Sequence, residues 1–314
     1  MKRLIVLTVI VFNILILAGC GKQQENRITF SDSGIEANVS GASVSGTTLT
    51  ITEAGSYTLT GSCAQGNIII DTVAGKAVYL YLDNFELSCS ETSPIQVKQC
   101  PLLVISANDG TQNILTDNHT YSELFEQGES ANAESLLNTV PTAAIDSRSP
   151  ILISGNTDAD KAGKLVINAN CYNGISCSDT VTVNGGILNI VAKNHAIRGK
   201  DFVVVSSGVL TLKAGNDGIK STNTEDAGLG YINITGGVIY IQASDEAIYA
   251  PHSVNFKGGN VTIKSKNTGI KTEGVIAFED GNVDIIASDD PILCESKILK
   301  PTAMVTANGS GLTE

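Results

Sequence analysis

The pentapeptide GNDGI, residues 215–219, places a single isoleucine directly after a polar turn, and the same figure returns along the chain. Aligned on that isoleucine, the other copies are CYNGI, KNHAI, SDEAI, KNTGI and SDDPI, which end at Ile175, Ile197, Ile248, Ile270 and Ile292. The isoleucine numbers increase in equal steps, except for one longer step between Ile219 and Ile248. A glycine keeps the same rhythm, at Gly186, Gly208, Gly237, Gly259 and Gly281. Two independent markers with one spacing indicate a structural repeat.

Each repeat contains short segments in which apolar and polar residues alternate. Examples are GGILNIVA (185–192), SGVLTLKA (207–214) and GGVIYIQA (236–243). Alternation of this kind predicts half-buried β-strands, and the preceding glycine marks a bend. Three short strands and three turns fit into one such repeat, which then makes one turn of a parallel β-helix. A β-propeller blade needs about 40 residues, so that fold is excluded. We therefore predict an all-β chain, a single-stranded parallel β-helix (β-solenoid) with coils of roughly 22 residues.

The repeated isoleucine is expected to point inward, each copy packed on the next coil. One coil cannot bury its inner face alone, whereas stacked coils share a continuous core. Upstream the period is less regular, but Ile95 and Ile145 are candidate earlier members of this ladder. A polar stretch at about 117–143 is predicted to be a loop leaving the stack. Residues 28–314 would then form one domain of on the order of ten coils.

The overall charge argues against nucleic-acid binding. The 314 residues carry 32 acidic and 20 basic side chains, a net charge of −12. Such a chain lacks the basic stripe that neutralises phosphates. With 31 glycines, no tryptophan and only 17% charged residues, the composition favours short strands and tight turns over helices.

The N-terminus predicts export and attachment to a membrane. Lys2 and Arg3 precede an apolar run from Leu4 to Leu17, and the tetrapeptide LAGC then ends at Cys20. A basic start, an apolar centre and small residues describe a secretory signal, here residues 1–19. LAGC resembles the lipobox of bacterial lipoproteins, so we expect a lipid on Cys20 and a tether over 20–27. Loss of the two bases would change the net charge from −12 to −14.

The turns before the isoleucines are the candidate metal site. In stacked coils these turns form a column, and carboxylates about 5 Å apart repel unless a cation lies between them. Oxygen ligands on flexible turns suit Ca²⁺. The opposing explanation is that Asn, Asp and Gly simply form good turns. The insertion in the longer repeat adds three more potential ligands, so the full candidate set is Asn216, Asp217, Asn223, Glu225, Asp226, Asp245 and Glu246.

The position after each isoleucine is the candidate sugar-binding strip. Arg198, Lys220, Tyr249 and Lys271 occupy it in successive repeats. Cations beside bound calcium would complement a polyanionic sugar such as a uronate, although a lysine on a solvent face is also ordinary.

The remaining cysteines and histidines carry no recognisable site motif. We expect most cysteines to be small buried apolar residues. Cys171 and Cys177 are close enough in sequence to form a disulfide, if their geometry allows it. The three histidines, His119, His195 and His252, are expected at the surface or in turns.

Four segments carry a family resemblance: AIRGKD (196–201), NDGIKSTN (216–223), GYINITGG (230–237) and GSYTLTG (55–61). They resemble the secreted carbohydrate-binding β-helix domains of clostridia and their relatives, which are themselves similar to calcium-dependent pectate lyases. The resemblance covers roughly positions 28–300. It implies a right-handed parallel β-helix, bound calcium, and binding of cellulose or pectic sugars. The DGI turn typical of the family is intact only at 217–219. The resemblance therefore implies a calcium site at Asp217 before any other turn.

Three functions follow from these observations. The first is a monomeric, lipid-anchored carbohydrate-binding protein at the cell surface with structural calcium. The second is a calcium-dependent polysaccharide lyase, in which Lys220, Arg198 or Lys271 would remove the proton α to a uronate carboxylate. The third is a structural solenoid or adhesin without sugar specificity. Polygalacturonate cleavage, calcium titration and a glycan panel distinguish them.

Overall fold

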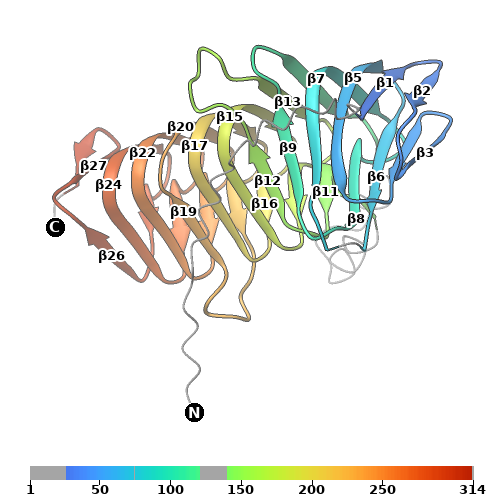
Figure 1. The fold of residues 1–314 in the computed structure, drawn as a ribbon. Coiled ribbons are helices and arrows are strands. Elements are labelled where there is room, and N and C mark those ends of the chain that lie inside the picture. Colours follow the sequence, from blue (N-terminus) through green and yellow to red (C-terminus); the bar gives the residue numbers. More distant parts are fainter. Residues whose placement is uncertain (1–25, 74, 121–139, 313–314) are drawn as a thin grey trace.

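The repeats stack as parallel strands in register, as the computed structural model shows (Figure 1). It describes residues 26–73, 75–120 and 140–312. The expected signal, Cys20 and most of the polar excursion at 117–143 lie outside these residues. Every described element is a strand, which confirms the all-β prediction. Within the same ranges no helix is long and apolar enough to cross a bilayer.

The strands form a larger and a smaller sheet. The 17-stranded sheet contains β1 (Arg27–Ser31), β2 (Gly34–Ala37), β5 (Gly55–Cys63), β7 (Val78–Cys89), β9 (Leu103–Ala107), β10 (Gln112–Asp117), β12 (Ile151–Ser154), β13 (Lys164–Ala169), β15 (Thr180–Ala192), β17 (Phe202–Ala214), β19 (Tyr231–Ile234), β20 (Val238–Ala243), β22 (Ser253–Ser265), β24 (Val275–Ala287), β26 (Ser296–Leu299), β27 (Ala303–Ala307) and β28 (Ser310–Gly311).

The 11-stranded sheet carries the isoleucine ladder. Its strands are β3 (Ala42–Ser45), β4 (Thr48–Ile51), β6 (Asn67–Asp71), β8 (Ile95–Gln99), β11 (Ala143–Ser147), β14 (Asn173–Cys177), β16 (Ile197–Gly199), β18 (Ile219–Ser221), β21 (Ile248–Ala250), β23 (Ile270–Thr272) and β25 (Ile292–Leu293).

Register within the smaller sheet confirms the predicted ladder. Ile219 pairs with Ile197 on one side and with Ile248 on the other. The series continues upstream through Ile175 and Ile145 to Ile95. Ile219 is completely buried. Because burying one such side chain is worth roughly 1.5–3 kcal/mol, each buried isoleucine of the ladder stabilises the stack.

The larger sheet wraps around two sides of the stack because its long strands bend. Within β15 and β17 the register shifts near Gly186 and Gly208, both of which have positive φ. A Cβ on Gly208 would lie 3.0 Å from the carbonyl oxygen of Gly186, so the glycine column lets adjacent repeats approach. The first half of β7 pairs with β9 and its second half with β10, and β15 pairs in the same way with β12 and β13. Parallel pairings therefore join six strands in a closed circuit: β7, β9, β12, β15, β13 and β10.

The C-terminal end continues further than the sequence pattern suggested. Residues 300–314 carry no obvious repeat, yet β27 pairs in parallel with β24, and Val305 is buried. Strand β28 then folds back antiparallel onto β27. Antiparallel hairpins also lie at the N-terminal end, where β1 pairs with β2 and β3 with β4. Such hairpins protect the open edges of a stack.

The cysteines are mostly core residues, as expected. Cys177 is a free buried thiol, so the bridge to Cys171 is not formed. Burial raises the pKa of Cys177 to about 12, which makes its thiol unreactive.

Candidate functional site

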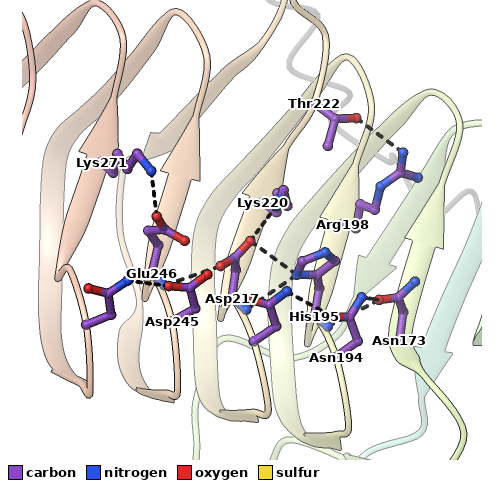
Figure 2. A network of polar contacts seen from close by, with 12 residues as sticks. Asn173, Asn194, His195, Arg198, Asp217, Lys220, Thr222, Asp245, Glu246 and Lys271 are labelled. Atoms are coloured by element: carbon purple, nitrogen blue, oxygen red, sulfur yellow. Dashed lines mark hydrogen bonds and ion pairs between the residues drawn. The ribbon is translucent and has the colours of Figure 1, made fainter. Parts of the chain in front are cut away.

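The turns that precede the ladder isoleucines form one continuous polar edge. Their backbones are joined across repeats, because the N–H of Ala196 donates to the carbonyl of Asp217 and that of Gly218 donates to the carbonyl of Glu246. The residues just before and after each isoleucine are therefore held in columns. Figure 2 shows the central part of this edge, with side chains from successive repeats side by side.

Asp217 is the central residue of the edge. It is completely buried, and its Oδ2 lies 2.7 Å from Nζ of Lys220 and 3.2 Å from Nδ1 of His195 (Figure 2). Its other oxygen, Oδ1, accepts a hydrogen bond from the backbone N–H of Glu246 at 3.3 Å. The carboxylate is thus tied to the repeats on both sides as well as to its own.

The contacts around Asp217 shift two pKa values. Burial tends to raise the pKa of Asp217, but the His195 ring and the Lys220 ammonium group outweigh it and hold this pKa well below its usual range. Burial lowers the pKa of His195, although Asp217 opposes the shift. At neutral pH, His195 is therefore uncharged and Lys220 is the cation that balances Asp217.

The next repeat holds a second carboxylate and lysine pair. Nζ of Lys271 donates to Oε1 of Glu246 at 2.8 Å. Burial raises the pKa of Glu246, as does the nearby Asp217 carboxylate, while Lys271 counteracts both. Between the two lysines lies Tyr249, whose ring centre is 5.2 Å from Nζ of Lys220 and 5.6 Å from Nζ of Lys271. The residues of the expected basic strip are therefore neighbours, and each of its two lysines forms an ion pair with a carboxylate.

Asp245 completes what we call the acidic cluster, namely Asp217, Asp245 and Glu246. One carboxylate oxygen from each lies within 4.8 Å of the others. The Asn216 amide lies 3.0 Å from Oδ2 of Asp245 and donates to it when its nitrogen faces that oxygen. From the other side, Nδ2 of Asn267 donates to Oδ1 of Asp245 at 2.5 Å. The three carboxylates offer the hard oxygen ligands that Ca²⁺ prefers, in competition with the two lysines.

The insertion in the longer repeat does not contribute to this cluster. Oδ1 of Asn223 accepts the backbone N–H groups of Glu225 and Asp226, and its Nδ2 donates to Asp201. Glu225 and Asp226 are exposed. Asp217 precedes strand β18 and Asn223 follows it, so the two residues lie at opposite ends of this strand. The seven candidate ligands therefore lie in at least two places, because Asn223, Glu225 and Asp226 form a separate turn, and metal binding at either place stays a prediction.

A groove of about 790 Å³ lies beside the acidic cluster, toward the N-terminal repeats. We call it the basic groove because four cationic side chains line it: Lys98, Arg148, Arg198 and Lys200. Its acidic lining residues are Asp146 and Glu225, and Tyr172 and His195 also contribute. The backbone and hydroxyl of Thr142 donate to Oδ2 of Asp146, and burial raises the pKa of this carboxyl group.

Only Arg198 among the four cations belonged to the expected strip. Its guanidinium lies 3.4 Å from the hydroxyl oxygen of Ser176. It also lies 3.3 Å from the hydroxyl oxygen of Thr222, the contact drawn in Figure 2. Lys98, Arg148 and Lys200 were missed, although each occupies the third position after a ladder isoleucine. Extending the ladder to Ile95 and Ile145, and examining that third position, would have found them.

Two of the histidines lie in segments between strands, one of the two expected locations, yet both are buried. His119 and His195 are 4% and 7% exposed, so they are not surface residues. Each has a buried aspartate partner, Asp117 and Asp217 respectively. A sequence does not reveal such pairs, because the partner of His195 comes from the neighbouring repeat.

Comparison with known proteins agrees with this architecture. A family model described as carbohydrate-binding domain-containing protein matches residues 45–311. A protein of that description from Acetivibrio thermocellus is 33% identical over 204 residues, which cover 61% of this chain. The chain spans 65% of the length of that relative. A solved structure, described as the polysaccharide lyase-like protein from C. thermocellum, Gadolinium derivative, matches with a TM-score of 0.67 and 30% identity, covering 88% of this chain and 98% of the other.

The family match spans the isoleucine ladder, the acidic cluster and the basic groove alike. The chain belongs to the family of carbohydrate-binding domain-containing proteins.

Proposed function

We propose that this chain binds an anionic polysaccharide, of the uronate type, along the basic groove. The observation that carries the proposal is the gathering of Lys98, Arg148, Arg198 and Lys200 around one groove in a chain with a net charge of −12. Lys98 and Arg148 follow paired isoleucines of adjacent repeats and Lys200 lies two repeats further on, so an extended polyanion laid across the stacked strands could contact all three. Charge-assisted hydrogen bonds from guanidinium to carboxylate are among the stronger polar contacts.

The groove lacks a broad aromatic platform, which favours charged over neutral sugars. Tyr172 is the aromatic residue in its described lining. A neutral glucan would have to rely on this ring and on hydroxyl contacts alone. We therefore expect recognition to depend on charge and to weaken as salt rises.

The proposal is tested by retention on immobilised polygalacturonate and on a neutral cellulosic gel. We expect retention on polygalacturonate, decreasing with salt, and about a tenfold loss of affinity in the double variant Arg198→Gln, Lys200→Gln, which corresponds to ~1.4 kcal/mol. Lys297→Gln, an exposed lysine outside the groove, is the matched control. Equal retention of the double variant, or preference for the neutral gel, would contradict an anionic ligand. Retention on no glycan would favour the structural or adhesin function.

Calcium is proposed as a structural ion at the acidic cluster. The support is the approach of three carboxylates within 4.8 Å, at a turn that matches the DGI motif. A Ca²⁺ ion there would displace the ammonium groups of Lys220 and Lys271 from Asp217 and Glu246. His195 both lines the groove and contacts Asp217, so ion binding and sugar binding would be adjacent.

Calorimetric titration of the chelator-treated protein with Ca²⁺ tests this ion. We expect binding that Asp245→Asn weakens, since the variant removes one charge while its amide can still meet Asn216 and Asn267. Glu225→Gln, in the separate turn, serves as the control and should bind as the wild type does. Identical titrations for Asp245→Asn and the wild type would show that the lysines alone balance the cluster.

A lyase activity is the second candidate because the solved relative is described as polysaccharide lyase-like. The side chains argue for binding over catalysis. A general base must be unprotonated, yet the hydrogen bond to Glu246 raises the pKa of Lys271, and Nζ of Lys220 lies 2.7 Å from Asp217. Arg198 is no better suited as a base, because a guanidinium group stays protonated in proteins. Appearance of an unsaturated product from polygalacturonate and Ca²⁺, abolished in Lys220→Ala, would establish the lyase instead.

The chain architecture and location complete the proposal. The stacked parallel register and the antiparallel end hairpins support a right-handed parallel β-helix with coils of roughly 22 residues. The lipobox-like LAGC supports a lipid anchor at Cys20 and display at the outer face of a bacterial membrane. Metabolic labelling with a fatty acid, lost in Cys20→Ala, tests the anchor.

A further inference from the structure

A second polar group lies in the core, away from the acidic cluster and the basic groove. Asp117 ends β10 and is completely buried. It pairs in register with Cys89 on one side and Ala169 on the other. The same column continues as Ala192, Ala214, Ala243, Ser265 and Ala287. A carboxylate therefore occupies an inward corner where the following repeats place small residues.

Two further potential metal ligands surround this carboxylate. His119 and Cys171 are 4% and 2% exposed, and one ligand atom from each of the three residues lies within 4.8 Å of the others. Nδ1 of His119 contacts Oδ1 of Asp117, and the backbone N–H of His119 donates to the same oxygen at 3.2 Å. Oδ2 of Asp117 has no hydrogen-bond partner among the described residues.

An unsatisfied carboxylate oxygen in a core is costly, because its charge loses hydration without compensation. The contacts from His119 reach the carboxylate through Oδ1 only. When a metal ion binds, cysteine coordinates as the thiolate and histidine as the neutral ring, so the three side chains together would carry a charge of −2. One divalent cation would neutralise them and give Oδ2 a partner.

We propose that Asp117, His119 and Cys171 bind a transition-metal ion of the zinc type. One oxygen, one nitrogen and one sulfur ligand suit borderline ions such as Zn²⁺ or Co²⁺, whereas Ca²⁺ takes oxygen ligands. Tetrahedral zinc keeps its ligand atoms about 3 Å or more apart, so binding would lengthen the Asp117–His119 contact. The site is separate from the calcium proposed at Asp217 and independent of sugar binding.

Cobalt substitution tests the proposal directly, because a thiolate bound to Co²⁺ gives a charge-transfer absorption band. The full chain, with Cys20→Ser in every sample to remove that thiol, is treated with chelator and titrated with Co²⁺ and then with Zn²⁺. We expect the band to appear at one equivalent of Co²⁺ and to vanish as Zn²⁺ displaces it. A folded protein that develops no such band overturns the proposal, whatever the variants do.

Matched cysteine variants locate the ligand. Cys171→Ser should remove the band and weaken Zn²⁺ binding at least tenfold in calorimetry, and His119→Gln should weaken binding similarly. Cys177→Ser changes a buried thiol outside the group and should leave both signals intact. Far-ultraviolet circular dichroism checks that each variant is folded. Unchanged binding by folded Cys171→Ser would assign the metal elsewhere and reject this site.

Discussion

The acidic cluster and the basic groove occupy the same edge, yet their charges are balanced differently. At the cluster, Lys220 and Lys271 come from the column beside the carboxylates and lie within 2.8 Å of them. In the groove, Lys98, Arg148 and Lys200 are exposed, and the carboxylate nearest the arginines, Asp146, is also hydrogen-bonded to Thr142. We therefore propose that one part of the edge mainly stabilises the stack, while the other presents charge to a ligand. Changes in the cluster should therefore affect stability first, and changes in the groove should affect binding first.

The largest effect is expected from Asp217→Asn. The variant keeps the size of the side chain but leaves Lys220 without its counterion, and breaking a buried ion pair costs roughly 3 kcal/mol or more. Urea unfolding should show this loss, while affinity for polygalacturonate, measured on folded protein, changes less than threefold. Asp226→Asn, in the exposed insertion, is the control and should be neutral. Wild-type stability in Asp217→Asn would mean that the cluster contributes nothing to the fold.

The groove should show the opposite behaviour. In the double variant Lys98→Gln, Arg148→Gln, polygalacturonate affinity should fall about tenfold, or ~1.4 kcal/mol, because two cations are lost from the N-terminal end of the groove. The melting temperature should stay within about 2 °C of the wild type, since exposed charges contribute little to stability. A loss of stability with unchanged affinity would reverse the roles assigned to the two regions.

A smaller effect is expected from Lys271→Gln. Glu246 would lose its cation beside Asp217, but the lysine side chain is 32% exposed and water partly compensates, so we expect a loss of about 1 kcal/mol. Thermal unfolding measures it, with Lys266→Gln as a control outside the cluster. If calcium occupies the site, adding Ca²⁺ should erase the difference between Lys271→Gln and the wild type.

The smallest effect concerns pH. Because the folded pKa of His195 lies below its ordinary value of 6.5, the unfolded chain binds protons more readily, and stability is lost as pH falls below about 6.5. Asp217, whose folded pKa is also lowered, contributes stability that is lost only as pH falls below about 3.8. His195→Asn, which copies Asn173 of the preceding repeat, should flatten the profile between pH 7 and pH 5. An unchanged profile in melting temperature would exclude His195 as its source.

The sequence alone determined the stack. The even spacing of the inward isoleucines and of the bend glycines predicts parallel register without any tertiary information, because each repeat needs an identical neighbour to bury its inner face. The same reasoning placed Asp217, Asp245 and Glu246 in neighbouring repeats. Lys98, Arg148 and Lys200 each follow a ladder isoleucine by three residues, so the same spacing could have located them. They were missed because the intervals between the upstream isoleucines are irregular.

Only the tertiary structure decided which partners these charges have. Whether Lys220 reaches Asp217 or solvent depends on side-chain geometry that residue spacing does not encode. The separation of Glu225 and Asp226 from Asp217 likewise follows from the direction of β18, and the burial of His119 beside Asp117 from the packing of a corner. Backbone hydrogen bonds between repeats fix where each residue lies along the stack. Which ion-pair or hydrogen-bond partner a charged residue has at the edge depends on individual side chains, and these differ from repeat to repeat.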